Sequence, residues 1–107
     1  MGQSLQKWSA PPAPTCSATG VAIFTDAARM TRETEGLEAA DCTTATGSHH
    51  RVAAALLDLG LHTLCEKPLA LTVRGCNAVI AAAERNGRIL SVAENYRRDP
   101  INRLIRA

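Results

Sequence analysis

The chain has 107 residues and a formal net charge of +2, and 46% of its residues are hydrophobic. This length suffices for one modest domain with its own core, and so small a charge gives no indication of a nucleic-acid or membrane partner. No apolar run approaches the roughly 20 residues that a membrane span needs, and no apolar segment follows Lys7 as it would in a secretory signal. We therefore expect a soluble, cytoplasmic protein.

The cysteines predict reduced thiols rather than a disulfide framework or a metal centre. Four are present without a CxxC pair, at Cys16, Cys42, Cys65 and Cys76. Together with His49 and His62 they are ligand types that zinc prefers, but their spacing matches no zinc pattern. Cys65 and Cys76 fall on apolar faces, where a free cysteine behaves as a small hydrophobic residue. We expect no metal site.

The first 19 residues predict a disordered or otherwise atypical tail. Residues 9–14 read Ser-Ala-Pro-Pro-Ala-Pro, and proline at this density excludes both a helix and a central strand. Regular structure is therefore expected only in residues 20–107.

From Gly20 onward, apolar runs alternate with helical patterns. After the short run at 21–24, strands are expected at about 41–44, 61–65 and 88–93. Helices are expected at 27–35, 49–59 and 73–86, and a last one begins at Pro100, where proline favours a helix start. Their expected N-terminal caps are the pair Thr25-Asp26, then Ser48 and Thr72, and their expected C-cap glycines are Gly60 and Gly87.

The apolar residues of the two longer helices recur at spacings of three and four, which predicts one buried face on each. The predicted faces are Val52, Ala55, Leu56 and Leu59 in the first helix, and Cys76, Val79, Ile80 and Ala83 in the second. Helices between short apolar strands predict an α/β fold with parallel, right-handed β-α-β-α-β pairing, which is half of a doubly wound sheet. One strand edge would stay unpaired and apolar, so we expect poor solubility or self-association.

Two segments carry a family resemblance. Residues 44–49 read Thr-Ala-Thr-Gly-Ser-His, and residues 60–70 read Gly-Leu-His-Thr-Leu-Cys-Glu-Lys-Pro-Leu-Ala. They resemble the patterns T-P-N-x-x-H and G-x-H-V-x-x-E-K-P-x-A of the Gfo/Idh/MocA oxidoreductases. A third stretch, Glu-Asn-Tyr-Arg-Arg-Asp-Pro at 94–100, resembles the segment that follows the last strand of the family's dinucleotide domain. The spacing between the segments makes the combined signal specific.

The resemblance implies a partial Rossmann fold in residues 20–107, with NAD or NADP as the cofactor and a sugar, inositol or related polyol as the substrate. It implies that Lys67 is catalytic and orients the substrate hydroxyl during hydride transfer. The cofactor would be lined by Thr44, Thr46, His49, Glu66, Lys67 and Asn95. In open parallel sheets, ligands do bind at the carboxyl ends of strands, where these residues are expected.

The chain also departs from the family pattern. It has no G-x-G-x-x-G turn for the pyrophosphate, and Ala45 stands where the family has proline. The first strands and the C-terminal α/β domain that supplies most substrate contacts are expected to be missing. We therefore expect a fragment of a dehydrogenase that is inactive alone. The alternative is a non-catalytic remnant or a small nucleotide-binding or interaction module.

Overall fold

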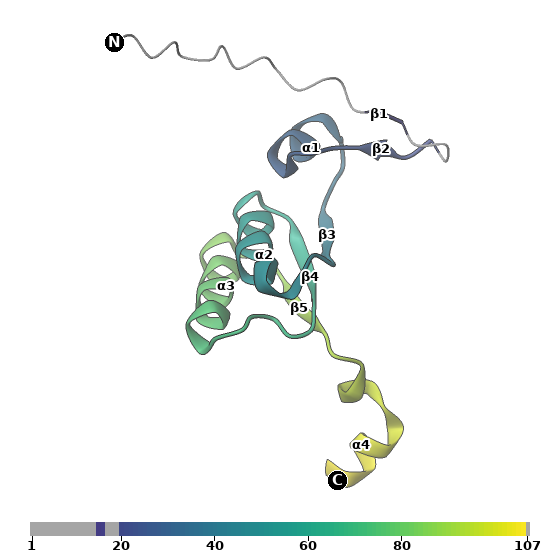
Figure 1. Ribbon diagram of the computed structural model, residues 1–107, viewed down its shortest axis with the longest axis vertical. Helices are drawn as coiled ribbons and strands as arrows, with labels where there is room; N and C mark the ends of the chain where they lie inside the picture. Colours follow the sequence, from purple (N-terminus) through teal and green to yellow (C-terminus); the bar gives the residue numbers. More distant parts are fainter. Residues whose placement is uncertain (1–14, 17–19, 107) are drawn as a thin grey trace.

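The computed structural model describes residues 15–16 and 20–106, and a three-stranded parallel sheet lies at its centre (Figure 1). The strands β3 (Ala39–Cys42), β4 (His62–Glu66) and β5 (Leu90–Ala93) lie in the order β3-β4-β5. Helix α2 (His49–Asp58) connects β3 to β4, and helix α3 (Val73–Asn86) connects β4 to β5. The predicted parallel β-α-β-α-β architecture is confirmed.

The strand bounds differ from the prediction by one to two residues. β3 ends at Cys42, so that Thr44, expected at the strand's end, lies in the loop beyond it. β5 begins at Leu90 rather than at residue 88, because Gly87 adopts a left-handed φ of 59° and the N–H of Arg88 bonds to Ala83 O at 3.0 Å. That bond belongs to the helix C-terminal motif and holds Arg88 out of the strand.

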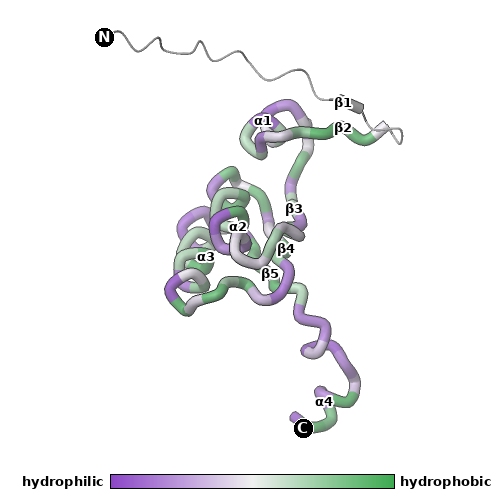
Figure 2. Tube along the Cα trace, viewed as in Figure 1, coloured by the Kyte–Doolittle hydropathy of each residue, from purple (hydrophilic) through white to green (hydrophobic). Residues whose placement is uncertain are grey.

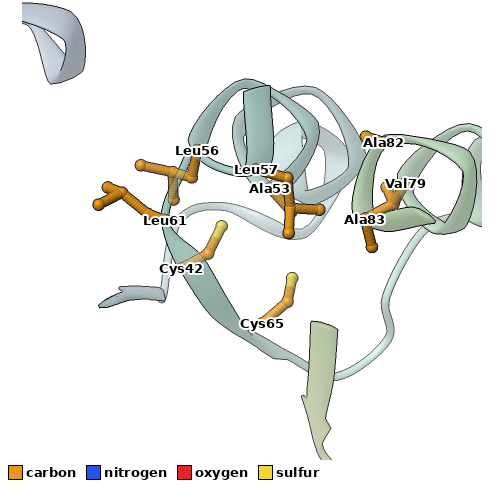
Figure 3. Close-up of a cluster of buried hydrophobic side chains, with 9 residues drawn as sticks. All are labelled: Cys42, Ala53, Leu56, Leu57, Leu61, Cys65, Val79, Ala82 and Ala83. Atoms are coloured by element: carbon orange, nitrogen blue, oxygen red, sulfur yellow. The ribbon is translucent and has the colours of Figure 1, made fainter. Parts of the chain in front are cut away.

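Helices α2 and α3 lie side by side on one face of the sheet (Figure 1). In Figure 3, the side chains of Cys42 and Cys65 rise from the two paired strands toward these helices. The core between the layers consists of Cys42, Ala53, Leu56, Leu57, Leu61, Cys65, Val79, Ala82 and Ala83.

The predicted helix faces were only partly right. α2 buries His49, Ala53, Leu56 and Leu57, while Ala55 is exposed and Val52 is only half-buried. α3 buries Gly75, Val79, Ala82 and Ala83, while Ile80 is exposed and Cys76 is half-buried. Each helix therefore buries positions i, i+4, i+7 and i+8. Of the predicted faces, only Leu56 in α2 and Val79 and Ala83 in α3 are buried, so the observed faces are rotated around each helix relative to the prediction.

Gly75 lies in the first turn of α3, at a position where the surrounding residues leave no room for a side chain. A Cβ atom built on Gly75 would lie 2.9 Å from Ala70 Cβ and 3.5 Å from His50 Cβ. The first turn of α3 therefore approaches the preceding loop too closely for a side chain, whereas the distance to α2 is an ordinary van der Waals contact. Close packing of this kind depends on volume and not on hydrophobicity alone.

Most expected caps are confirmed. Thr72 Oγ1 accepts a hydrogen bond from Gly75 N at 3.1 Å at the start of α3. Gly60, with a φ of 84°, follows α2 as a C-terminal glycine. Ser48 stands at the N-cap position of α2, but its side chain makes no capping hydrogen bond.

Two further parts of the chain flank this core. Strands β1 (Thr15–Cys16) and β2 (Ala22–Ile23) pair antiparallel and precede helix α1 (Ala27–Glu33). The short helix η2 (Asn95–Arg98) and helix α4 (Pro100–Arg106) follow β5.

Neither α1 nor α4 buries a residue. Figure 2 shows apolar segments of β2 and α4 that lie away from α2 and α3. Residues 1–14 and 17–19 of the expected tail lie outside the described residues, and Thr15–Cys16 forms β1. None of the helices described is long and apolar enough to span a membrane.

Candidate functional site

Three loops leave the carboxyl ends of β3, β4 and β5. Since the strands are parallel, these loops lie along one edge of the sheet, where ligands of open α/β sheets bind. The first loop carries Thr44 and Thr46, the second follows Glu66 and begins with Lys67, and the third carries Asn95. The side chain of Glu66 is half-buried, and the other four are exposed.

The first loop is closed by its own serine. Ser48 Oγ lies 2.7 Å from Ala45 O and 2.9 Å from Thr44 Oγ1. The serine expected to cap α2 thus turns back onto the loop that precedes the helix, and the first turn of α2 keeps no side-chain cap. Backbone N–H groups at an uncapped helix start are donors for an anionic ligand.

The second loop places the two charged residues of the predicted motif side by side. Lys67 N donates a hydrogen bond to Glu66 Oε2 at 2.9 Å, so this carboxylate shapes the backbone of the turn. The Lys67–Pro68 peptide bond is cis. The Lys67 side chain is exposed, and no ion pair holds it among the described residues.

His49 joins the first two loops. Its ring is 2% exposed. Nε2 lies 2.9 Å from Thr44 O, and Nδ1 lies 2.8 Å from Pro68 O. The ring therefore connects the loop after β3 to the turn that follows Lys67. The sequence pattern singled out His49, but its contact with Pro68 spans 19 positions and no local signal would have found it. The bond from Ser48 to Ala45 O joins residues three apart, which is a local alternative to capping that was missed.

The structure does not bring all the candidates together. Asn95 begins η2, and within the described part of the chain neither its side chain nor that of Thr46 bonds to another candidate residue. A hollow of about 840 Å³ next to Asn95 lies against β5 and is lined by Leu90, Ser91, Val92, Glu94, Arg97, Arg98 and Arg103. That hollow is separate from Thr44 and Lys67.

Two buried thiols lie beneath the first two loops. Cys42 and Cys65 are register partners in β3 and β4, and both are free and buried. Burial, followed by the neighbouring Cys42 thiol, raises the pKa of Cys65 to about 12. Such a thiol is protonated at neutral pH and is a poor nucleophile. The expectation that this cysteine packs as a small hydrophobic residue agrees with its surroundings. No group of three potential metal ligands occurs among the described residues.

Sequence comparison agrees with this arrangement. The sequence profile of the Gfo/Idh/MocA oxidoreductase family, which has an NAD-binding Rossmann fold, matches residues 5–94. The chain belongs to the Gfo/Idh/MocA family. The match begins within the segment that was expected to be a tail, although the G-x-G-x-x-G turn is absent from the sequence.

Two curated relatives carry the names of a sugar dehydrogenase and an inositol dehydrogenase. The chain is 37% identical over 78 residues to D-apiose dehydrogenase from Paraburkholderia graminis. This alignment covers 73% of this chain and 20% of the relative. It is 40% identical over 65 residues to myo-inositol dehydrogenase Hyg17 from Streptomyces leeuwenhoekii. That alignment covers 61% of this chain and 20% of the relative. The chain thus spans about one fifth of the length of these Gfo/Idh/MocA relatives.

Solved structures show the same fold. An inositol dehydrogenase homologue from Azotobacter vinelandii, solved with NADH and myo-inositol, aligns with a TM-score of 0.59 and 32% identity, over 64% of this chain and 18% of its own. An oxidoreductase from Pseudomonas syringae aligns with a TM-score of 0.62 and 31% identity, over 68% and 21%. NAD(P) is the cofactor expected of an intact member of this family.

The residues at the carboxyl edge fit part of such a cofactor. A dinucleotide presents ribose hydroxyls and phosphate oxygens, and the exposed threonine hydroxyls, the uncapped start of α2 and the Lys67 ammonium supply hydrogen-bond donors to both. The glycine-rich turn that would let the backbone approach the pyrophosphate is absent from the sequence. The fit is therefore limited to the hydrogen-bond donors on the loops after β3 and β4, which would contact ribose hydroxyls or phosphate oxygens.

Proposed function

We propose that this chain forms part of the dinucleotide-binding domain of an NAD(P)-dependent oxidoreductase that acts on a sugar, inositol or related polyol. The observation that carries the proposal is the position of Lys67, which is exposed directly after β4 at the ligand-binding edge of a Gfo/Idh/MocA domain. The names of the sugar and inositol dehydrogenase relatives support the substrate class.

Lys67 is proposed as the catalytic residue. Oxidation of a polyol removes a hydride from carbon and a proton from the hydroxyl, and an ammonium group beside that oxygen stabilises the developing alkoxide. Lys67 suits this role because its side chain is exposed while its backbone N–H is held by Glu66. When bound, the nicotinamide would supply the hydride chemistry.

The cofactor contacts are proposed for the neighbouring loops. Thr44 and Thr46 would offer hydroxyls after β3, and Asn95 would offer an amide after β5. Glu66 and His49 would act mainly by shaping these loops, since a Glu66 oxygen is engaged by Lys67 N and the ring of His49 is buried.

The isolated 107-residue chain is proposed to be inactive. It spans about one fifth of its dehydrogenase relatives, and catalysis needs substrate and cofactor held together in one geometry. Turnover of any polyol by the isolated chain would contradict this point. If a chimera that supplies the remaining parts of a dehydrogenase also showed no turnover, the alternative of a non-catalytic remnant or a small nucleotide-binding or interaction module would be favoured.

A chimera tests the proposal. Residues 20–107 would replace the matching segment of D-apiose dehydrogenase, and turnover would be measured with the sugar. Lys67→Ala should lower kcat roughly 10²-fold or more with little change in cofactor affinity. Lys67→Arg should not restore kcat, because a planar guanidinium does not replace a compact ammonium. Arg88→Ala is the matched control and should keep full kcat. Arg88 precedes β5, so it lies at the amino ends of the strands, away from the proposed site.

Self-association through the open sheet is part of the proposal. Within the described residues, β3 pairs with β4 alone, and the sheet face opposite α2 and α3 carries a hollow of about 390 Å³ that includes Leu64, Ile89 and Ser91. Unpaired strand edges with apolar neighbours favour pairing with another chain. Sedimentation velocity should show a mass that rises with protein concentration, whereas a monomer at every concentration would contradict this.

A further inference from the structure

The outer side of strand β5, called the β5 edge below, has no neighbouring strand in the described part of the chain. β5 pairs with β4 alone, and Ile89 O accepts a hydrogen bond from Thr63 N of β4 at 2.8 Å. Backbone groups of successive strand residues point to opposite sides, so those of Leu90 and Val92 point outward. Val92 O is used locally by Glu94 N at 2.8 Å. The N–H and C=O of Leu90 and the N–H of Val92 therefore remain available to a further strand.

A hollow of about 840 Å³ lies along this edge. Three consecutive residues of β5 line it, namely Leu90, Ser91 and Val92. Their side chains alternate between the two faces of the sheet. Leu90 packs against the core beneath the helices, whereas Ser91 also lines the hollow on the opposite face. A hollow that touches all three residues therefore lies beside the strand, in the position that an added strand would occupy.

Three arginines also line this hollow, namely Arg97, Arg98 and Arg103. Their side chains are exposed, and the ion pairs found among the described residues involve other arginines. Of the described residues that line the hollow, Glu94 alone is acidic, and its Oε1 accepts a hydrogen bond from Tyr96 N at 3.0 Å. The hollow thus carries a positive charge, and its guanidinium groups are available to carboxylates from another molecule.

We propose that the β5 edge binds an acidic peptide segment of a partner protein, which adds to the sheet as an extended strand. Main-chain hydrogen bonds to Leu90 and Val92 would hold any extended segment, and carboxylates paired with the arginines would select acidic ones. β5 has four residues, so the bound segment would span about four to six. This surface extends away from Thr44 and Lys67, and the inference does not depend on the oxidoreductase activity.

Other occupants fit the β5 edge less well. Arg88 precedes β5, and Arg97 and Arg98 follow it. Pairing the β5 edges of two copies, in either direction, would bring arginines of one copy close to arginines of the other, and like charges in such positions repel. A nucleic acid would satisfy the arginines through its phosphates, but it offers no row of alternating donors and acceptors to a strand edge. An acidic peptide satisfies both parts of the surface.

Titration of the full 107-residue chain with two synthetic peptides tests the charge preference. One peptide has the sequence Glu-Val-Glu-Val-Glu with blocked ends, and the other has lysine in place of each glutamate. Backbone amide shifts should change in β5 and around the three arginines with the acidic peptide alone. Equal binding of the two peptides, or no shift in β5, would overturn the proposal.

Two arginine variants test which side chains select the acidic peptide. The double variant Arg98→Gln, Arg103→Gln should bind it roughly tenfold more weakly or worse, as expected for the loss of charge-assisted hydrogen bonds. Arg32→Gln is the matched control and should bind it as the native chain does. Arg32 is exposed on α1, which lies far from η2 and α4 in Figure 1. Equal affinities of the double variant and the control would contradict selection by these arginines.

Methylation of the peptide's own backbone separates strand addition from attraction by charge. Alternate N–H groups of an added strand face β5, and the others face solvent. Two acidic peptides, N-methylated either at the glutamates or at the valines, keep the same charge but block opposite sides. One should lose binding roughly tenfold or more, as expected for the loss of main-chain hydrogen bonds, and the other should bind like the unmethylated peptide. Equal affinities of the two, or tighter binding of a single-stranded oligonucleotide than of the acidic peptide, would overturn the proposal.

Discussion

The segment from β3 to β5 and the segments on either side of it use the same local signals with different results. Asp26 Oδ1 caps α1 by accepting a hydrogen bond from Arg29 N at 2.7 Å, just as Thr72 caps α3. Yet α1 and α4 bury no residue, whereas α2 and α3 bury four each. Local capping therefore specifies where a helix begins, but it does not provide a packing partner.

This difference locates the stability of the protein. Most helical stability in proteins comes from packing an apolar face and not from local propensity. The flanking segments expose large apolar side chains, namely Val21, Ile23, Ile101, Leu104 and Ile105, each at least half exposed. We conclude that residues 39–93 form the centre of the cooperative unit, against which half-buried Met30 and Leu37 also pack. The following predictions test this contrast from the largest expected effect to the smallest.

Removing a core leucine should have the largest effect. Leu57 is 0% exposed, whereas Leu104 on α4 is 76% exposed. Leu57→Ala should lower the free energy of unfolding by about 2–5 kcal/mol, because it removes buried methyl groups and leaves a cavity. Leu104→Ala should change it by less than about 0.5 kcal/mol. Urea denaturation measures both, and similar losses in the two variants would remove the distinction between core and flank.

The Cys65 thiol should make stability fall at alkaline pH. Burial raises its pKa from 9.0 to about 12, so between these values the folded state keeps a proton that the unfolded state has lost. The contribution is complete below pH 9 and declines as the pH rises toward 12, by about 2 kcal/mol at pH 10.5. The difference in unfolding free energy between the native chain and Cys65→Ala should shrink accordingly.

At pH 8, alkylation should modify half-buried Cys76 before Cys65, and the reverse order would contradict this.

Adding one methyl group at the contact between α3 and its neighbours comes next. Gly75→Ala places a Cβ 2.9 Å from Ala70 Cβ, and we expect a loss of about 1–3 kcal/mol from overpacking despite the better helix propensity of alanine. The control is Gly47→Ala, where the new Cβ meets nothing within 4 Å. An unchanged or higher melting temperature for Gly75→Ala would show that the loop at Ala70 moves aside at no cost, and it would contradict the expected overpacking.

The caps should show the smallest effects. Thr72→Ala removes the hydrogen bond to Gly75 N and should cost about 1 kcal/mol of global stability. Asp26→Ala removes an equivalent cap from α1 but should shift the global unfolding midpoint much less, because α1 buries no residue fully and only half-buried Met30 of this helix packs against the core. Thermal unfolding followed by circular dichroism compares the two. Equal shifts would mean that α1 unfolds together with the core.

These contrasts also explain what the sequence could predict. The bounds of α3 and the roles of Thr72 and Gly87 follow from residues within one turn of each helix end, and they were predicted correctly. The buried faces of the helices were not predicted correctly, because they depend on contacts between elements. The contacts of Gly75 in α3 with Ala70 and His50 are an example.

The site shows the same division. The family pattern pointed to His49 and Lys67, and their positions after β3 and β4 follow from the parallel topology. The bond from His49 to the carbonyl of Pro68 spans 19 positions, and no periodicity in the sequence contains it. Ser48 was expected as a cap because local rules ignore the competing Ala45 carbonyl at 2.7 Å.

The most direct test of the central claim is an NADH titration of the isolated chain, followed by backbone amide chemical shifts. The claim is that the carboxyl edge of the sheet forms part of a dinucleotide site. Shifts should therefore concentrate at Thr44, Thr46, Lys67 and Asn95, even if binding is weak, while Gly60 and Gly87 at the opposite edge stay unchanged. Shifts confined to that opposite edge, or none at millimolar NADH, would contradict the account.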